Sequence, residues 1–213
     1  MKPRLPFDIL FEDRDLIVID KPAGLLTTHT RLHTRVARET QPTAENFLND
    51  YVRKGQARSS KRVWLVHRLD RETSGVMAFA KSESVADALR TNWSKLARKT
   101  YVARVEGRLD GEEGRFESEL LEDPKTYKVH SVEKGGKKAV TLWRVTGRGR
   151  DWTDVEVEIL TGRKNQIRVH FSEAGHPVVG DVKYGAKKAA RLYLHSQTLR
   201  IEGKGEWSSS RRP

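Results

Sequence analysis

The chain has 213 residues, which is enough for one sizeable domain or two small ones. Its 41 lysine and arginine residues exceed its 29 aspartate and glutamate residues, so the formal net charge is +12 at pH 7. A charge this positive on so small a chain favours a polyanionic partner, most simply a nucleic acid. Cysteine is absent, which excludes disulfides, thiolate metal sites and a cysteine nucleophile.

The sequence shows no sign of a membrane span or a metal site. No stretch approaches the roughly 18 consecutive apolar residues of a membrane span, and the first residues lack the apolar core of a signal peptide. We therefore expect a cytoplasmic protein that does not contact a membrane. The 7 histidines show no metal-ligand spacing, and no glycine-rich phosphate-binding loop of the P-loop type occurs. We expect no metal.

The first predicted elements are a buried strand and a helix. The strand is the continuous apolar run at 16–19, which the turn at 21–24 ends. Residues 27–41 are polar and basic and indicate a loop. Thr43 can cap the helix, whose apolar stripe is Phe47, Leu48, Tyr51 and Val52. The polar segment 53–62 that follows is predicted as a basic loop that could face a nucleic acid.

A single carboxylate, Asp70, lies between two apolar runs. The runs at 63–66 and 76–80 are typical of buried strands. An ionised aspartate at the end of a buried strand is costly unless something pairs with it. Such a residue most often bonds nearby backbone N–H groups in a turn. A perturbed carboxylate at this position can also carry chemistry, which makes Asp70 a candidate catalytic residue.

The second half of the chain is rich in strands. A helix is predicted to begin at Ser84, and residues 99–106 alternate as a half-buried strand. The apolar side of that helix would consist of Val85, Ala88, Leu89, Trp93 and Leu96. Alternation continues around 140–142 and 155–159, and the connections beside these strands resemble hairpins. Residues 166–174 fit a strand or a helix, and the glycine and proline that follow favour a helix.

Strands that do not alternate strictly with helices favour an α+β fold. We expect a mixed, largely antiparallel sheet with flanking helices. The sequence contains no internal repeat, and no domain boundary is strong enough to claim two domains. Residues 1–213 are therefore interpreted as a single domain that ends in a polar tail at 203–213.

Five segments together resemble one enzyme family, the RNA pseudouridine synthases of the rRNA and tRNA (RluA) type, as a stand-alone catalytic domain. The segments, in chain order, are Leu16–Leu25, His67–Gly75, Lys99–Ala103, Thr161–His170 with the Gly175–Asp181 region, and Leu194–Ser196. The sequence departs from the family pattern in two places. Asn165 stands where the family commonly has a histidine, and the C-terminus lacks the apolar ending often seen.

The resemblance implies a pseudouridine synthase-like fold with a central catalytic cleft, and an isomerase that converts uridine to pseudouridine without a cofactor. Asp70 would be the essential carboxylate, acting as a nucleophile at C1′ or as a base at C2′. Arg168 would pair with Asp70 in a bidentate way and keep it ionised. Tyr101 would give the uracil a face on which to stack.

The remaining site residues implied by the resemblance bind the substrate. Arg68 would fill the space left when the uridine flips out of its stack, and Ile167 would form an apolar wall. His67 and Thr73 belong to the same motif as Asp70. Further basic residues would hold phosphates, namely Arg31, Arg35, Arg38, Arg53, Lys54, Arg58, Lys61 and Arg62.

The expected partner is an RNA, either rRNA or tRNA, with no obligate protein partner and a monomeric state. One alternative is a non-catalytic RNA-binding or ribosome-assembly protein on the same fold. The joint presence of Asp70, Tyr101 and Arg168 argues against it, because function depends on the site rather than the fold. Another alternative is a hydrolase, but no second catalytic acid accompanies Asp70 in the motif. The residues do not indicate which RNA or which uridine is modified.

Overall fold

The structure, a computed structural model, describes residues 5–29, 41–56 and 58–211. Its strands are β1 (Asp8–Glu12), β2 (Leu16–Lys21), β3 (Trp64–Leu65), β4 (Ser74–Ala80), β5 (Ala97–Glu106), β6 (Glu113–Glu122), β7 (Val129–Val132), β8 (Lys137–Arg148), β9 (Trp152–Ile159), β10 (Leu194–Ile201) and β11 (Gly205–Ser208). Its helices are α2 (Ala44–Arg53), α3 (Glu83–Leu96), α4 (Gln166–Glu173) and the short 3₁₀ helix η1 (Val182–Tyr184). No helix within the described residues is long and apolar enough to cross a membrane.

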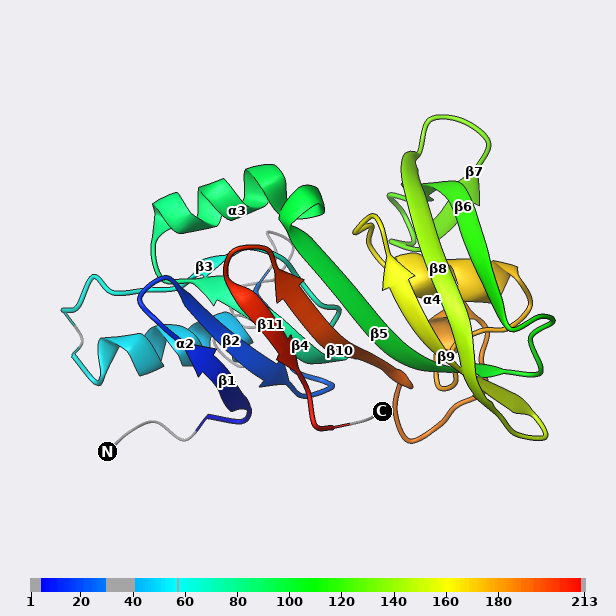
Figure 1. Cartoon of the computed structure of the whole chain (residues 1–213), viewed down its shortest axis with the longest axis horizontal. Coiled ribbons are helices and arrows are strands. Elements are labelled where there is room, and N and C mark those ends of the chain that lie inside the picture. The colour runs from blue at the N-terminus through cyan, green and yellow to red at the C-terminus, as the bar shows by residue number, and fades with distance from the viewer. Residues whose placement is uncertain (1–4, 30–40, 57, 212–213) are drawn as a thin grey trace.

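The strands of the described residues join in one 11-stranded sheet. Its order is β1-β2-β4-β10-β5-β9-β8-β6-β7, with β3 added to β4 and β11 to β10. The pair β4–β10 is parallel and the other pairs are antiparallel. The α+β class with a largely antiparallel sheet is therefore confirmed. We call β1, β2, β4, β10 and β5, with β3 and β11, the first half of the sheet, and β9, β8, β6 and β7 the second half. Figure 1 shows α2 and α3 beside the first half and α4 beside the second.

Strands β2 and β4 form the centre of the first half and are buried on both faces. Ile17 and Ile19 pack in the cluster that contains α2 residues, whereas Leu16 and Val18 pack in the cluster that contains α3 residues. Because side chains alternate along a strand, covering both faces requires a continuous apolar run rather than alternation. This explains the unbroken apolar run that the sequence shows at 16–19.

The predicted helices are present, with differences in detail. Thr43 caps α2 through a capping box, since its hydroxyl accepts from the Asn46 N–H at 3.1 Å. Helix α3 begins one residue before the predicted Ser84, because Ser82 is the N-cap and accepts from the Val85 N–H. Ala88 is exposed and Ala86 is buried instead, so the predicted apolar side was wrong at that position.

The ambiguous segment at 166–174 is helical, as predicted. The N-cap of α4, Asn165, adopts the left-handed conformation with φ 54°. Two other expectations need correction. Strand β3 is only two residues long, since the chain leaves the sheet soon after Leu65 toward Asp70. Part of the segment predicted as a polar tail is the edge strand β11. Its Trp207 side chain packs on Phe11, with the two ring centres 5.2 Å apart.

We predict that Gly75→Ala destabilises the protein strongly. Gly75 is the second residue of β4 and has φ +112°, and a Cβ there would lie 2.2 Å from the carbonyl oxygen of Ser196 on the parallel partner strand. The backbones would have to separate, so the free energy of unfolding should fall by more than about 2 kcal/mol. Urea denaturation measures this loss.

Gly203→Ala is the matched control for this prediction. Gly203 has φ +72°, but a Cβ there would meet nothing within 4 Å. It should cost only the strain of a left-handed alanine, about 1 kcal/mol. Equal losses for the two variants would show that the close approach of β4 to β10 is not the cause.

Candidate active site

A small cavity of ≈ 80 Å³, here called the active-site cavity, lies where the two halves of the sheet meet α4. It collects side chains from the loop between β3 and β4, from β5 and from the start of α4. Of the seven residues predicted for the site, six line this cavity, namely Arg68, Asp70, Thr73, Tyr101, Ile167 and Arg168. The fold therefore assembles segments that are about a hundred residues apart in the sequence.

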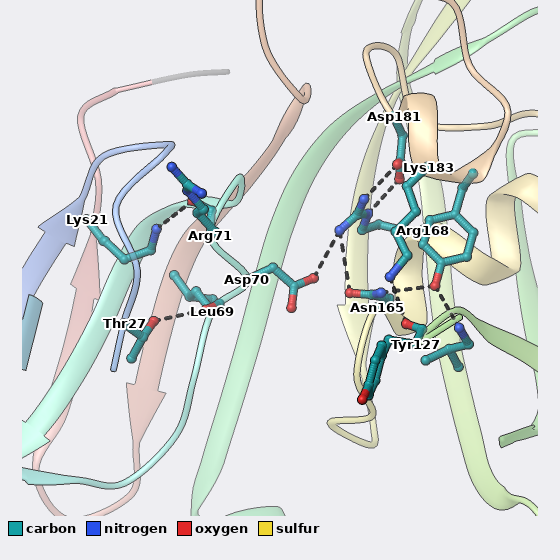
Figure 2. A network of polar contacts seen from close by, with 12 residues as sticks. Lys21, Thr27, Leu69, Asp70, Arg71, Tyr127, Asn165, Arg168, Asp181 and Lys183 are labelled. Carbon is teal, nitrogen blue, oxygen red and sulfur yellow. Dashed lines mark hydrogen bonds and ion pairs between the residues drawn. The ribbon is translucent and has the colours of Figure 1, made fainter. Parts of the chain in front are cut away.

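The loop that carries Asp70 is a tight turn fastened to the chain that follows β2. The Thr73 N–H donates to the Asp70 carbonyl at 3.2 Å and closes the turn. The Thr27 hydroxyl donates to the Leu69 carbonyl at 2.9 Å (Figure 2). Arg71 and Gly24 exchange two bonds, one from the Gly24 N–H and one from the Arg71 guanidinium. Bonds on both sides of Asp70 fix its backbone.

Lys21 reinforces the same loop from within the core. Its side chain is fully buried, and its ammonium group donates to the carbonyls of Pro22, Leu25 and Arg71 at 3.0, 2.8 and 3.2 Å. Burial lowers the pKa of Lys21 to about 7, although the charge of Asp70 opposes this change. We did not assign Lys21 a role from the sequence. The signals were its place at the end of a buried strand and its position in the first segment that resembles the family, Leu16–Leu25.

The Asp70 carboxylate lies beside the guanidinium of Arg168. The Nη1 atom of Arg168 lies 3.5 Å from Oδ2 of Asp70, an ion pair that is long for a direct hydrogen bond. The Asp70 side chain keeps 32% of its surface exposed. Burial nonetheless raises the pKa of Asp70 above its ordinary value, and the Arg168 charge opposes the rise. The ion pair is present as predicted, but the charge of Arg168 offsets only part of the rise in the Asp70 pKa that burial causes.

The bidentate partner of Arg168 is Asp181, not Asp70, which corrects the sequence interpretation. Arg168 donates from Nε and Nη2 to the two Asp181 oxygens at 2.6 and 2.7 Å. Figure 2 shows this pair above the Asp70 contact. The Asp181 side chain has no exposed surface, and its bonds raise the pKa of Arg168. Asp181 therefore fixes the plane of the guanidinium, which turns one remaining nitrogen toward Asp70.

Asn165 supports the same guanidinium from another side. Its side-chain oxygen accepts from Arg168 Nη1 at 3.4 Å, and its amide donates to the Tyr184 hydroxyl at 2.9 Å (Figure 2). The Tyr184 hydroxyl in turn accepts from the Val129 N–H at 3.1 Å. Asparagine tolerates the left-handed backbone found here. The residue that departs from the family pattern therefore still supplies an acceptor to Arg168.

The other cavity residues differ in exposure in a way that suits different roles. Tyr101 is 5% exposed and Ile167 is 4% exposed, and both belong to the main apolar cluster. Burial, followed by the charge of Asp70, raises the pKa of Tyr101, so its phenol stays neutral. Thr73 is buried, whereas Arg68 is exposed at the rim. The cavity thus has apolar walls and an exposed cation at its mouth.

His67 does not line the active-site cavity. Its ring is buried and stacks on Trp93 at 4.7 Å, and Nε2 accepts from the Ala78 N–H at 3.0 Å. Burial lowers the pKa of His67 well below its ordinary value, so the ring is neutral. With Nε2 accepting, the proton belongs on Nδ1, which has no bonding partner in the described part of the chain. His67 faces a neighbouring groove, and substrate binding by it stays a prediction.

Two larger depressions adjoin the active-site cavity, and Asp70 lines both. A side hollow of ≈ 570 Å³ is bordered by the cations Arg71, Lys164, Arg168, Lys183, Lys188 and Arg191. A wide groove of ≈ 1100 Å³ is bordered by Arg68, Arg90, Trp93, Tyr127, Arg163 and Lys164, among others. In both depressions around Asp70 the cationic side chains therefore outnumber the carboxylates.

The basic residues singled out in the sequence for phosphate contacts are placed differently. Those in the segment 53–62 line neither depression nor the active-site cavity. Arg31, Arg35 and Arg38 lie outside the described residues. Sequence reasoning missed the lysines at 164, 183 and 188, because nothing in their local pattern separates them from other surface lysines.

Comparison with known proteins agrees with this architecture. The pattern of the RNA pseudouridylate synthase family matches residues 15–173. An uncharacterized RNA pseudouridine synthase YjbO of Bacillus subtilis is 35% identical over 200 residues, which cover 92% of this chain and 67% of that protein. The dual-specificity RNA pseudouridine synthase RluA of Vibrio parahaemolyticus is 34% identical over 215 residues, which cover 95% of this chain and 81% of that protein.

The fold also matches solved structures. Human RNA pseudouridylate synthase domain containing 4 superposes with a TM-score of 0.77 at 24% identity, covering 96% of this chain and 88% of that chain. The Asp70 carboxylate and the Arg168 guanidinium face one another where the two halves of this mixed sheet meet, and the fold is that of an RNA pseudouridylate synthase domain. The chain belongs to the RNA pseudouridylate synthase family. It spans 59% to 67% of the length of four of its relatives.

We predict that Asp181→Asn lowers the pKa of Asp70. In the unaltered protein Arg168 pairs with two carboxylates, those of Asp181 and Asp70. The substitution removes the Asp181 charge, so the guanidinium should stabilise the Asp70 carboxylate more strongly. In the unaltered protein the Asp70 pKa should lie above 3.8, since burial raises it. A ¹³C NMR titration of the Asp70 carboxyl carbon measures both values.

Asp154→Asn is the matched control. Asp154 also accepts two bonds from one arginine, Arg104, at 2.7 and 2.9 Å, but it lines none of the three depressions around Asp70. Its loss should leave the Asp70 titration unchanged. An upward shift in Asp181→Asn would contradict the shared-guanidinium interpretation.

Proposed function

We propose that this protein isomerises uridine to pseudouridine in structured rRNA or tRNA, with Asp70 as the essential carboxylate. The observation that carries the proposal is the Asp70–Arg168 ion pair, at 3.5 Å, lining one cavity with the buried Tyr101. Membership of the family supports the reaction class. The geometry supports the assignment of the reacting group.

The reaction needs no external reagent. The bond between C1′ of the ribose and N1 of the uracil breaks, the detached base turns, and C1′ bonds to C5. The proton on C5 is lost and a proton returns to N1, so atoms and electrons balance within the nucleotide. No cofactor or metal is therefore required by the chemistry, and the protein has to supply only a base or nucleophile and a closed pocket.

The ionised Asp70 carboxylate acts on the ribose. It either attacks C1′ as a nucleophile or removes the proton on C2′ as a base. Both routes require the deprotonated acid, which burial disfavours and Arg168 favours. Arg168 therefore keeps Asp70 reactive, and Asp181 and Asn165 keep Arg168 in position.

The walls of the cavity suit a flat pyrimidine. Tyr101 offers a rigid aromatic face, and Ile167 offers an apolar one. A stacked uridine must leave its helix or loop to enter, which costs a few kcal/mol. Arg68 is exposed at the rim, where its planar guanidinium can stack in the space that the base leaves. We propose that His67 and Thr73 shape the loop that presents Asp70.

A binding-only protein on the same fold is the second reading, and the site argues against it. Such a protein would gain nothing from burying a carboxylate whose pKa is raised by that burial. The assembly of Asp70, Tyr101 and Arg168 in one cavity is explained by catalysis. We also propose that residues 1–213 act as a single catalytic domain, as a monomer, in the cytoplasm.

We predict that Asp70→Asn abolishes pseudouridine formation and leaves RNA affinity within a few-fold. The amide can neither attack nor remove a proton, but it adds no bulk at the cavity wall. The measurement is a map of new pseudouridines in unmodified rRNA and tRNA after incubation with the protein. Asp154→Asn, which is remote from the cavity, should retain full turnover. Retained turnover in Asp70→Asn would remove Asp70 from the mechanism.

We predict that Arg168→Lys slows turnover on the order of 100-fold, a loss typical of a misplaced reacting group. Lysine cannot bond both oxygens of Asp181 and also face Asp70, because it lacks the planar fork of arginine. Single-turnover kinetics with excess enzyme isolates the chemical step. A rate near that of the unaltered protein would show that the fork is unimportant.

We predict an acidic limb in the pH dependence of the rate. The active form of Asp70 is the carboxylate, and burial raises its pKa above 3.8. The rate should therefore fall as the pH is lowered through that raised pKa, earlier than for an ordinary aspartate. In Asp181→Asn the limb should move to lower pH. A profile with no acidic limb above pH 3.8 would contradict the raised pKa.

A further inference from the structure

An exposed tyrosine stands at the edge of the wide groove beside Asp70. Tyr127, in the connection between β6 and β7, is 47% exposed and lines this groove. Figure 2 shows its ring directed away from the Asn165 and Lys183 side chains. A single exposed aromatic side chain is common on protein surfaces, but this one stands in a groove bordered by cations. No pattern in the sequence singles it out.

The backbone at Tyr127 adopts a conformation that bulky residues avoid. Its φ is 53°, in the left-handed region that favours glycine and asparagine. The Tyr127 N–H donates to the Asp123 carbonyl at 2.9 Å, and its own carbonyl accepts from the Lys183 ammonium at 2.8 Å. The Asp123 carboxylate accepts from two further N–H groups of the turn. The surrounding bonds therefore hold the backbone of Tyr127 in this conformation at the rim of the groove despite the strain.

The charge around the ring suits a polyanion. The Lys164 ammonium lies over the ring, 5.9 Å from its centre, and also pairs with Glu122. Arg68 and Arg163 line both the wide groove and the active-site cavity, so the two are continuous. A single strand that enters the cavity with one nucleotide would thus leave it along a basic surface that reaches Tyr127.

We propose that Tyr127 is a stacking platform for an unpaired base of the RNA, next to the nucleotide that enters the active-site cavity. The ligand class is single-stranded RNA, with phosphates held by Lys164 and Arg163 and a base lying on the tyrosine face. A positive groove with an exposed aromatic ring binds single strands in this way, since every base has a face for stacking. The proposal rests on the proposed function.

The test compares Tyr127→Asn with Tyr127→Phe. Asparagine tolerates the left-handed backbone, so the first variant removes the ring without changing the turn, and the second keeps the ring. The probe is a fluorescein-labelled oligouridylate 12-mer, with binding measured by anisotropy in the Asp70→Asn background so that the RNA stays unaltered. Tyr127→Asn should weaken binding roughly 5- to 150-fold. Tyr127→Phe should stay within about twofold, since its ring stacks equally well.

Salt dependence separates stacking from phosphate contacts. Tyr127→Asn removes no charge, so the slope of log affinity against log salt should be unchanged. Lys164→Gln removes one phosphate contact and should reduce the magnitude of that slope by about 0.7, the value for one contact to a single strand. With Asp70 intact and the RNA concentration varied up to saturation, Tyr127→Asn should raise KM and leave kcat within about twofold, because the ring does not touch the reacting atoms.

The outcomes separate this proposal from the proposed function. Unchanged binding in Tyr127→Asn, an equal loss in Tyr127→Phe, or an altered salt slope would each overturn the platform. Failure of the unaltered protein to form any pseudouridine would overturn the proposed function instead. In that case a ring-dependent loss of oligouridylate binding would still support Tyr127 as a base-stacking site.

Discussion

The site depends on one guanidinium that serves two carboxylates. Arg168 makes two short bonds to Asp181, which is fully buried, and one longer contact to Asp70. The short pair is structural, because it fixes an otherwise flexible side chain on the first turn of α4. Under the proposed function, the longer contact is the one that serves catalysis, because it favours the charged form of Asp70 without fully neutralising it. A direct bidentate pair with Asp70 would stabilise the anion more and make it a weaker nucleophile or base.

Most of the fold follows from the sequence, because burial on both faces of a strand leaves a distinct pattern. The unbroken apolar runs at β2 and β4 and the alternation along β5 predict strands, and Thr43 predicts the start of α2. One error arises where a tertiary contact decides. The strand β11 was missed because Trp207 packs on Phe11, a residue near the other end of the chain. The start of α3 was misplaced for a local reason, since two serines, Ser82 and Ser84, could each cap the helix and Ser82 does so.

The candidate site could be predicted as a set of residues but not as a geometry. The sequence motifs name Asp70, Tyr101 and Arg168, and the fold brings them to one cavity. The motifs do not reveal which carboxylate receives the fork of Arg168, since Asp181 lies 13 residues away and joins it only through the turn before η1. Nor do they reveal Tyr127, whose role is argued from its exposure and backbone conformation in the structure.

The two halves of the sheet are joined beneath the cavity by the continuous ladder between β5 and β9, which runs from Thr100 opposite Glu158 to Glu106 opposite Trp152. Under the proposed function, a cleft spanned by such a ladder would open little when the RNA binds. The distortion needed for docking then falls on the nucleic acid. Selection among uridines would then depend on how easily the RNA around each uridine deforms. This is a form of indirect readout, in which the deformability of the RNA rather than the identity of its bases determines binding.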